Sequence, residues 1–193
     1  MNILETDGER LLSAVRSLLE KKGIVSTAEI QERMAVTDAA SPGQGARMVA
    51  RAWVDPVYRA SMLEDGSKAA EALGIPMRGM PPLGVLENTA EVHNLVVCTL
   101  CSCYPRAVLG YPPFWYKSAA FRARAVRDPR SLLAAEWKTV IPESVKVRVV
   151  DSTADYRWMV LPARPSGTEG WDEARLAGIV REGDMIGVTV PRA

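Results

Sequence analysis

The sequence has few of the features that mark nucleic-acid-binding, membrane or secreted proteins. Its 193 residues carry 24 basic and 23 acidic side chains, and a net charge of +1 gives no general attraction to nucleic acid or anionic membranes. No apolar run approaches the length of a membrane span. The first seven residues (Met1–Asp7) carry acid instead of the basic and apolar regions of a signal peptide. We therefore expect a cytoplasmic protein that binds neither nucleic acid nor membrane.

Cysteine and histidine are also scarce, but the cysteines are not scattered. Cys98, Cys101 and Cys103 fall within six consecutive positions, and His93 is the only histidine. Cysteines that serve only as core side chains would be spread along the chain, so this clustering indicates a chemical role. Free, clustered cysteines are typical of proteins in a reducing cytoplasm.

The spacing of the cysteines suits a metal site of an unusual kind. Three thiolates at i, i+3 and i+5 can converge on one ion if the backbone forms a tight loop. Because only Ser102 separates Cys101 from Cys103, the amide nitrogens of Ser102 and Cys103 come within bonding reach of the same ion. These five donors leave a sixth octahedral position for water or substrate, and they favour Co(III) or Fe(III) over Zn(II). An open position on a Lewis acid indicates a catalytic metal.

Two other interpretations of the cysteines stay open on spacing alone. His93, five residues before Cys98, could complete a structural zinc site with the three thiols. A disulfide with one thiol left over is the second alternative, although Cys-x-Cys and Cys-x-x-Cys spacings strain such a bond.

The segment around the cysteines resembles the metal-binding signature of the nitrile hydratase alpha subunit family. Within it, Thr99 and Tyr104 resemble the cobalt type, whereas the iron type usually has Ser and Thr at these places. The resemblance covers residues 87 to 190 closely and the N-terminal part loosely. It rests on these blocks: Glu87-Asn88-Thr89, Val92-His93-Asn94, Val97-Cys98-Thr99-Leu100-Cys101-Ser102-Cys103-Tyr104, Trp115-Tyr116-Lys117-Ser118, Asp128-Pro129-Arg130, Val150-Asp151-Ser152-Thr153 and Arg164-Pro165-Ser166-Gly167-Thr168-Glu169-Gly170-Trp171.

The resemblance implies the metal-bearing subunit of an enzyme that adds water to a nitrile to give the amide. Its metal ligands would be the sulfurs of Cys98, Cys101 and Cys103 and the backbone nitrogens of Ser102 and Cys103. The metal would be one Co(III), in preference to Fe(III), with Cys101 oxidised to sulfinic acid and Cys103 to sulfenic acid. The ion would polarise the nitrile or lower the pKa of a bound water, and the Cys103 sulfenate oxygen would be nucleophile or base.

The resemblance also implies residues around the centre and partner proteins. Asp151, Asp155 and Arg157 match positions where the family keeps an Asp, a Glu and an Arg near the metal, so we expect them around it together with Thr99 and Tyr104. The partners would be a nitrile hydratase beta subunit, or two smaller beta-like subunits, and a cobalt-insertion activator protein. A small-molecule nitrile would be the substrate.

Two residues depart from the common pattern of the family and bear on the substrate. Arg106 stands where the family usually places a Trp that helps to wall the pocket, and Tyr111 also differs. A guanidinium in place of an indole should make the pocket wider and more polar, so we expect a larger polar nitrile, such as a heteroaromatic or nucleoside-like one. Two rival functions stay open: the catalytic subunit of thiocyanate hydrolase, which shares the cobalt motif, and a non-catalytic zinc-binding assembly subunit.

The pattern of secondary-structure signals changes near residue 75. Residues 1–74 are predicted to be a string of short amphipathic helices that form an arm, which the resemblance implies will pack on the partner subunit. Residues 75–83, rich in Pro and Gly, are the predicted linker, and residues 84–193 the catalytic metal-binding domain. That domain is predicted to have strands at 84–86, 95–97, 145–150, 156–161 and 185–190, and helices at 131–138 and 172–180.

The predicted fold class is α+β. We expect a layered α/β/β/α-type domain in which helices flank a mixed or antiparallel sheet. The metal loop is expected at the end of the strand that precedes Cys98.

Overall fold

The computed structural model describes residues 7–193, which divide between Ala39 and Ala40 into two compact units. Residues 1–6, on which most of the expectation about a signal peptide rests, lie outside the described residues. Within residues 7–193, no helix combines the length and the apolar character needed to cross a bilayer.

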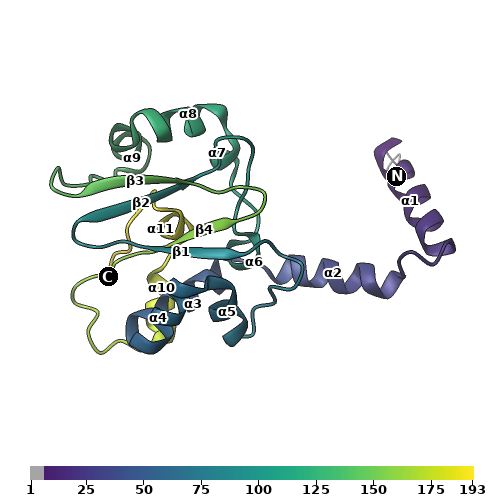
Figure 1. Cartoon of the computed structure of the whole chain (residues 1–193), viewed down its shortest axis with the longest axis horizontal. Helices are drawn as coiled ribbons and strands as arrows, with labels where there is room; N and C mark the ends of the chain where they lie inside the picture. Colours follow the sequence, from purple (N-terminus) through teal and green to yellow (C-terminus); the bar gives the residue numbers. More distant parts are fainter. Residues whose placement is uncertain (1–6) are drawn as a thin grey trace, which may run out of the picture. The chain divides into compact units, whose positions relative to one another are not determined.

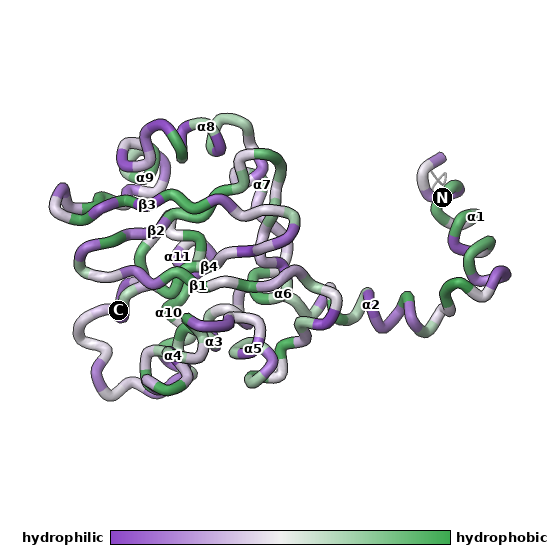
Figure 2. Tube along the Cα trace, in the orientation of Figure 1, coloured by the Kyte–Doolittle hydropathy of each residue, from purple (hydrophilic) through white to green (hydrophobic). Residues whose placement is uncertain are grey.

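The first unit consists of helices α1 (Asp7–Lys21) and α2 (Thr27–Ala39). Ser26 and Glu29 form a capping box at the start of α2. The Glu29 N–H donates to Ser26 Oγ at 3.2 Å, and the Ser26 N–H donates to Glu29 Oε2 at 2.7 Å. Neither helix buries a residue, and Figure 2 shows that hydrophobic and hydrophilic residues follow one another along α1. Short helices of this kind gain most of their stability from packing against other surfaces.

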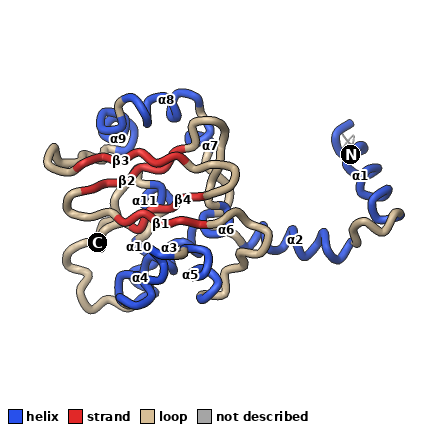
Figure 3. Tube along the Cα trace, viewed as in Figure 1, coloured by secondary structure: helices blue, strands red, loops and turns tan. Residues whose placement is uncertain are grey.

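The second unit is built on two pairs of parallel strands (Figures 1 and 3). Strand β1 (Leu83–Glu87) pairs with β4 (Arg157–Leu161), and β2 (Val92–Val97) pairs with β3 (Lys146–Asp151). The expected mixed or antiparallel sheet is therefore wrong. The connection from β2 to β3 runs through helices, and the connection from β1 to β4 also contains β2 and β3. Both are long, as connections between parallel neighbours must be.

Helices cover the strands from two sides (Figure 1). Helices α4 and α5 pack on β1, whereas α8 and α9 pack on β2 and β3. The helices of this unit are α3 (Pro42–Val54), α4 (Pro56–Glu64), α5 (Gly66–Ala72), α6 (Arg106–Leu109), α7 (Phe114–Lys117), α8 (Ala119–Arg127), α9 (Pro129–Trp137), α10 (Glu173–Ile179) and α11 (Glu182–Ile186).

Two boundaries differ from the sequence expectations. Helices α3 to α5 belong to the second unit, since Met48, Val49 and Met62 are buried in the same core as the strands. The division at Ala39 thus replaces the expected end of the arm at residue 74. The predicted strand at 185–190 is wrong, because Met185 and Ile186 lie in helix α11. A short apolar run does not distinguish a buried strand from a buried helical turn.

His93 is a buried structural residue of β2. Its Nε2 lies 2.7 Å from the Gly187 carbonyl oxygen, and its Nδ1 lies 3.2 Å from Asn88 Nδ2. Because a carbonyl only accepts, the proton sits on Nε2 and Nδ1 accepts from Asn88. Gly187 has φ +87°, and a Cβ there would overlap the Asn94 carbonyl oxygen, so the contact depends on glycine.

We expect the His93→Gln variant to lose part of the pH dependence of stability. Burial lowers the pKa of His93 from its ordinary value of 6.5, so the unfolded chain binds the proton more readily. The stability associated with the neutral imidazole is therefore present above that pH and is lost as the pH falls toward the folded-state pKa. Urea unfolding at about pH 8 and about pH 5.5 measures the loss in unfolding free energy.

Since His93 is the only histidine, that loss should be smaller in the variant than in the wild type. Equal losses in both proteins would show that the buried imidazole does not carry this pH dependence.

Candidate metal centre

The loop after β2 brings the three cysteines together. All three are free, and their Sγ atoms lie within 4.8 Å of one another. Cys101 Sγ is 3.5 Å from Cys98 Sγ and 3.2 Å from Cys103 Sγ. One ion can contact all three sulfurs at this separation, given metal–sulfur bonds of about 2.3 Å in thiolate sites. The spacing thus produces the convergence that the sequence predicted.

Burial and hydrogen bonding make the three thiols unequal. Cys98 and Cys103 are buried, whereas Cys101 is exposed. Hydrogen bonds from Cys103 and then Cys98 lower the pKa of Cys101. Burial raises the pKa of Cys103, and the positive charge of Arg157 opposes that rise. Cys101 is therefore the thiol that an ion or a reagent meets first.

The structure does not supply His93 as a fourth zinc ligand. Across residues 7–193, the three cysteines are the only close group of three or more side chains able to hold a metal. Both ring nitrogens of His93 are engaged, one with Asn88 and the other with Gly187. The side-chain ligands are therefore the three cysteine sulfurs alone. Three soft, strongly donating sulfurs suit the kind of metal site expected from the spacing.

Asp151 holds the first half of the loop. Its Oδ1 accepts from the Thr99 N–H at 3.0 Å, and its Oδ2 accepts from the Thr99 hydroxyl. Asp151 is the last residue of β3 and lies opposite Val97 in the parallel register. Since Val97 ends β2, the strand pairing itself places the carboxylate beside the start of the loop.

Two buried tyrosines hold the second half of the loop. The Tyr116 hydroxyl donates to the Cys103 carbonyl oxygen at 2.9 Å, and the Tyr104 hydroxyl donates to Glu182 Oε1 at 2.5 Å. Their rings meet edge to face with centroids 4.9 Å apart. Burial raises the pKa of both tyrosines well above the usual value, so both stay protonated donors.

Two arginines near the loop, Arg122 and Arg157, each have a buried N–H group without a hydrogen-bond acceptor. In the described part of the chain, the only buried side-chain nitrogen or oxygen atoms without a partner are Arg122 Nε and Arg157 Nη1. Arg122 Nη1 donates to the Thr99 carbonyl oxygen at 3.2 Å. Unpaired buried N–H groups are rare and call for an explanation, and an anionic centre at the loop would provide one.

Among the described residues, the remaining expected site residues (Asp155, Arg106 and Tyr111) make no hydrogen bond or ion pair with the cysteines. Asp155 is exposed between β3 and β4 and, within residues 7–193, makes no hydrogen bond or ion pair with the loop. Arg106 and Tyr111 pair with each other, with the guanidinium carbon 4.3 Å from the ring centroid. Tyr116, Glu182 and Arg122 were missed as loop contacts, because their side chains reach the loop from distant elements and no local pattern marks them.

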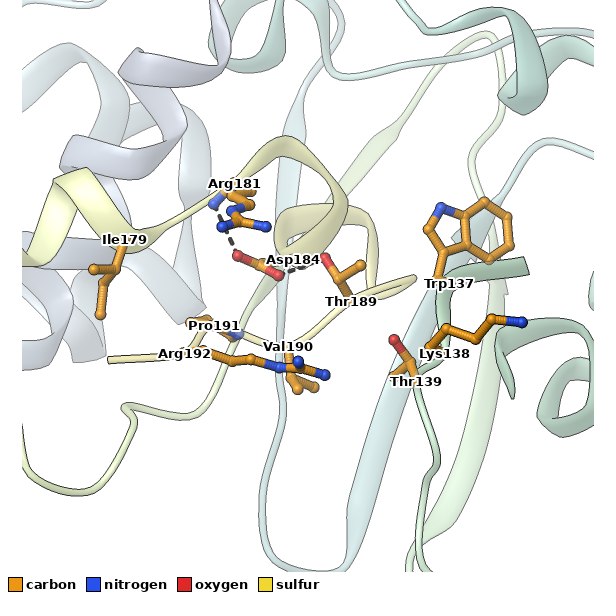
Figure 4. Close-up of a pocket in the computed structure, with 10 residues that line it drawn as sticks. All are labelled: Trp137, Lys138, Thr139, Ile179, Arg181, Asp184, Thr189, Val190, Pro191 and Arg192. Atoms are coloured by element: carbon orange, nitrogen blue, oxygen red, sulfur yellow. Dashed lines mark hydrogen bonds between the residues drawn. The ribbon is translucent and has the colours of Figure 1, made fainter. Parts of the chain in front are cut away.

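A pocket of about 160 Å³ lies elsewhere, between the end of α9, helix α11 and the C-terminal segment (Figure 4). Asp184 lies in its wall, where its Oδ2 accepts from the Arg181 N–H at 2.8 Å and its Oδ1 from the Thr189 hydroxyl at 2.5 Å. None of the expected site residues lines this pocket. The candidate site is the cysteine loop.

The loop and the fold have counterparts among known proteins. Residues 6–189 match the family described as nitrile hydratase, alpha chain. This chain belongs to that family. The low-molecular weight cobalt-containing nitrile hydratase subunit alpha of Rhodococcus rhodochrous is 48% identical over 181 residues, covering 93% of this chain and 87% of that protein.

Solved structures of similar chains agree with this membership. A recombinant thiocyanate hydrolase with partially modified cobalt centres is 41% identical and has a TM-score of 0.87, over 97% of this chain and 91% of that one. A double mutant of the Fe-type nitrile hydratase from Comamonas testosteroni Ni1 is also 41% identical, with a TM-score of 0.80 over 96% and 90% of the two chains.

Membership of the nitrile hydratase alpha-chain family confirms the resemblance seen in the sequence and the α+β fold class. Alpha chains are the catalytic subunits of a hetero-oligomeric hydro-lyase, so this chain is an enzyme subunit. Its cysteine cluster is the group able to hold the family's metal.

In the reduced, metal-free chain, Cys101 should react with iodoacetamide before Cys98 and Cys103. It is exposed and its pKa is lowered, whereas the other two thiols are buried. Peptide mass mapping after a short exposure at neutral pH gives the order of labelling. Co²⁺ added before the reagent should protect Cys101, and unchanged labelling would contradict a shared metal site.

Proposed function

We propose that this chain is the metal-bearing subunit of a cobalt nitrile hydratase, which adds water to a nitrile to give the amide. The observation that carries the proposal is the convergence of three free sulfurs within 4.8 Å on the loop of a chain whose relatives include cobalt-containing nitrile hydratases. Cys98, Cys101 and Cys103 would hold Co(III) with the backbone nitrogens of Ser102 and Cys103. When bound, the ion supplies a Lewis acid.

The residues around the loop fit such a centre. Oxidation of Cys101 to sulfinic acid and of Cys103 to sulfenic acid would add oxygens with partial negative charge, which need hydrogen-bond donors. Arg157 has a buried, unpaired Nη1, and its charge acts on Cys103. Asp151 and Tyr116 hold the backbone on either side of the sulfurs, so that the loop keeps its shape while a substrate binds and leaves.

The residues that follow the loop favour a polar substrate. Arg106 begins α6 just after the loop, and its guanidinium stacks on the Tyr111 ring. Both side chains are exposed, and together they present a charged and aromatic surface where the family usually has a Trp. This surface suits a larger polar or heteroaromatic nitrile better than a small aliphatic one.

Two observations favour a second candidate, the catalytic subunit of thiocyanate hydrolase. The positive charge of Arg106 would attract an anionic substrate such as thiocyanate. The similarity to a thiocyanate hydrolase chain, with a TM-score of 0.87, supports the same candidate. The products separate the two functions, because nitriles give amides and thiocyanate gives carbonyl sulfide and ammonia.

The complex purified from cobalt-fed cells that co-express the neighbouring genes should hydrate a cyanopyridine to its amide faster than it hydrates acrylonitrile. The Cys103→Ser variant should lose activity by at least about 100-fold, since even residues behind metal ligands contribute 10-fold to 100-fold. Chromatography of the amide and gas analysis for carbonyl sulfide measure both reactions. Carbonyl sulfide from thiocyanate without any amide from nitriles would establish the second candidate and contradict the first.

The uncovered face of α1 supports a protein partner, either one beta subunit or two smaller beta-like subunits. Leu11 is 67%, Leu12 69% and Leu18 53% exposed, and their spacing places them on one side of the helix. An apolar stripe of this size on an otherwise polar helix is typical of a surface that packs against another chain. The family resemblance also implies a cobalt-insertion activator protein as a further partner.

The Val15→Asp variant should lose the partner subunits while the second unit stays folded. Val15 lies on the apolar stripe of α1, and a carboxylate there opposes burial against another chain. Co-purification with the products of the neighbouring genes measures binding, and the far-ultraviolet circular dichroism of the chain checks its folding. Ser13→Asp, on the opposite face of the same helix, is the matched control and should bind normally. Equal co-purification of both variants would contradict an interface on this stripe.

A further inference from the structure

We propose that Arg122 is a positioning residue of the metal centre, which acts with Asp151 to fix Thr99 and so shapes the cysteine loop before the ion arrives. The proposal rests on the metal function proposed above. It concerns the part of the loop between Cys98 and Cys101, where only Thr99 and Leu100 separate two of the three sulfurs.

Every polar backbone and side-chain group of Thr99 is engaged by these two residues. Asp151 accepts from its N–H at 3.0 Å and from its hydroxyl, and Arg122 Nη1 donates to its carbonyl oxygen at 3.2 Å. The two side chains carry opposite charges and come from different elements, Asp151 from the end of β3 and Arg122 from α8. Asp151 and Arg122 therefore bind the Thr99 segment from two different elements.

Core packing does not explain the conformation of Thr99. Thr99 is exposed, and the next residue, Leu100, is 87% exposed. An exposed segment without apolar contacts takes its shape from its hydrogen bonds. With Thr99 fixed, the direction of the chain from Cys98 to Cys101 is fixed as well, and the Cys101 N–H lies 3.3 Å from Cys98 Sγ.

Helix α8 gives Arg122 a rigid base. The Ser118 side chain caps the helix by accepting from the Phe121 N–H at 3.1 Å. Phe121 is buried, and its ring centroid lies 5.0 Å from that of Trp115 and 6.0 Å from that of Trp137. Phe121, the residue before Arg122, is thus held by packing in an aromatic cluster. The backbone of Arg122 is therefore well positioned, and its guanidinium extends from it to the loop.

The charge of Arg122 also suits the assembled centre. Its Nε is buried without a partner, which is unfavourable unless an anionic group lies nearby. Three thiolates and two amide anions outnumber the charges of Co(III), so the assembled loop is anionic and favours a nearby cation. Arg122 therefore stabilises the metal-bearing loop more than the metal-free one.

Titration of the reduced, metal-free full chain with Co²⁺ tests this role through the thiolate-to-cobalt absorption band. Arg122→Met keeps the aliphatic stem and the helix propensity but removes the donors and the charge. We expect its dissociation constant for Co²⁺ to rise about 10-fold to 100-fold, as for other residues behind metal ligands. Arg122→Lys keeps the charge and one donor, and its affinity should fall between those of Arg122→Met and the wild type.

Arg124→Met is the matched control. Arg124 lies on the same helix, but its guanidinium pairs with Glu136 at 2.7 Å and makes no hydrogen bond with the loop in the described chain. This variant should bind Co²⁺ like the wild type. The Tm of the metal-free Arg122→Met chain should stay close to that of Arg124→Met, because Thr99 adds nothing to the core.

The outcomes separate the inference from the function on which it rests. Equal Co²⁺ affinities for the wild type, Arg122→Met and Arg122→Lys overturn the inference alone. If metal-free Arg122→Met fails to fold or its Tm falls strongly, the Arg122→Lys chain decides. A folded Arg122→Lys chain with the intermediate affinity supports the inference. Any other result for Arg122→Lys assigns Arg122 a structural role and overturns the inference. A wild-type chain that takes up no cobalt contradicts the proposed function, and the inference falls with it.

Discussion

The parallel pairing of β2 with β3 is the constraint on which the cysteine loop depends. Parallel strands end at the same edge of their sheet, so the chain that leaves β2 at Val97 emerges beside Asp151, the end of β3. The Thr99 contacts follow directly from this register. A shift by one residue would turn the Asp151 carboxylate to the other face and leave the loop without its anchor. In β3, Lys146 and Arg148 are exposed whereas Val147 and Val149 are half-buried, so a one-residue slip would also exchange these two faces.

Around this anchor, neutral donors and cations surround the loop, where the proposed metal centre would be anionic. Tyr104 and Tyr116 stay protonated because they are buried, so they contribute directed hydrogen bonds without charge. Arg122 and Arg157 contribute the charge, each with one buried nitrogen unpaired. Helix α11 joins this arrangement through Glu182, which accepts from Tyr104. The exposed Cys101 leaves one side of the sulfur cluster open, as a site that exchanges small molecules requires.

The convergence of the sulfurs could be predicted from the sequence because six consecutive residues cannot separate three side chains far. The strands β1 to β4 could be located from their apolar and alternating residues, but their direction could not, since pairing is decided by segments some 50 to 75 residues apart. For the same reason the contacts of Tyr116, Arg122 and Glu182 with the loop, over 13, 23 and 78 residues, leave no local signal. The arm ends at Ala39 instead of residue 74 because α3 to α5 have amphipathic faces that pack within the chain.

The most direct test of a metal centre built by this loop is X-ray absorption at the cobalt edge, on protein purified from cobalt-fed cells. Cys98, Cys101 and Cys103 predict three sulfur neighbours around each cobalt, with nitrogen or oxygen completing the shell, and an edge position typical of Co(III). Protein without cobalt, or cobalt with fewer than three sulfur neighbours, would contradict a centre formed by the three converging thiols.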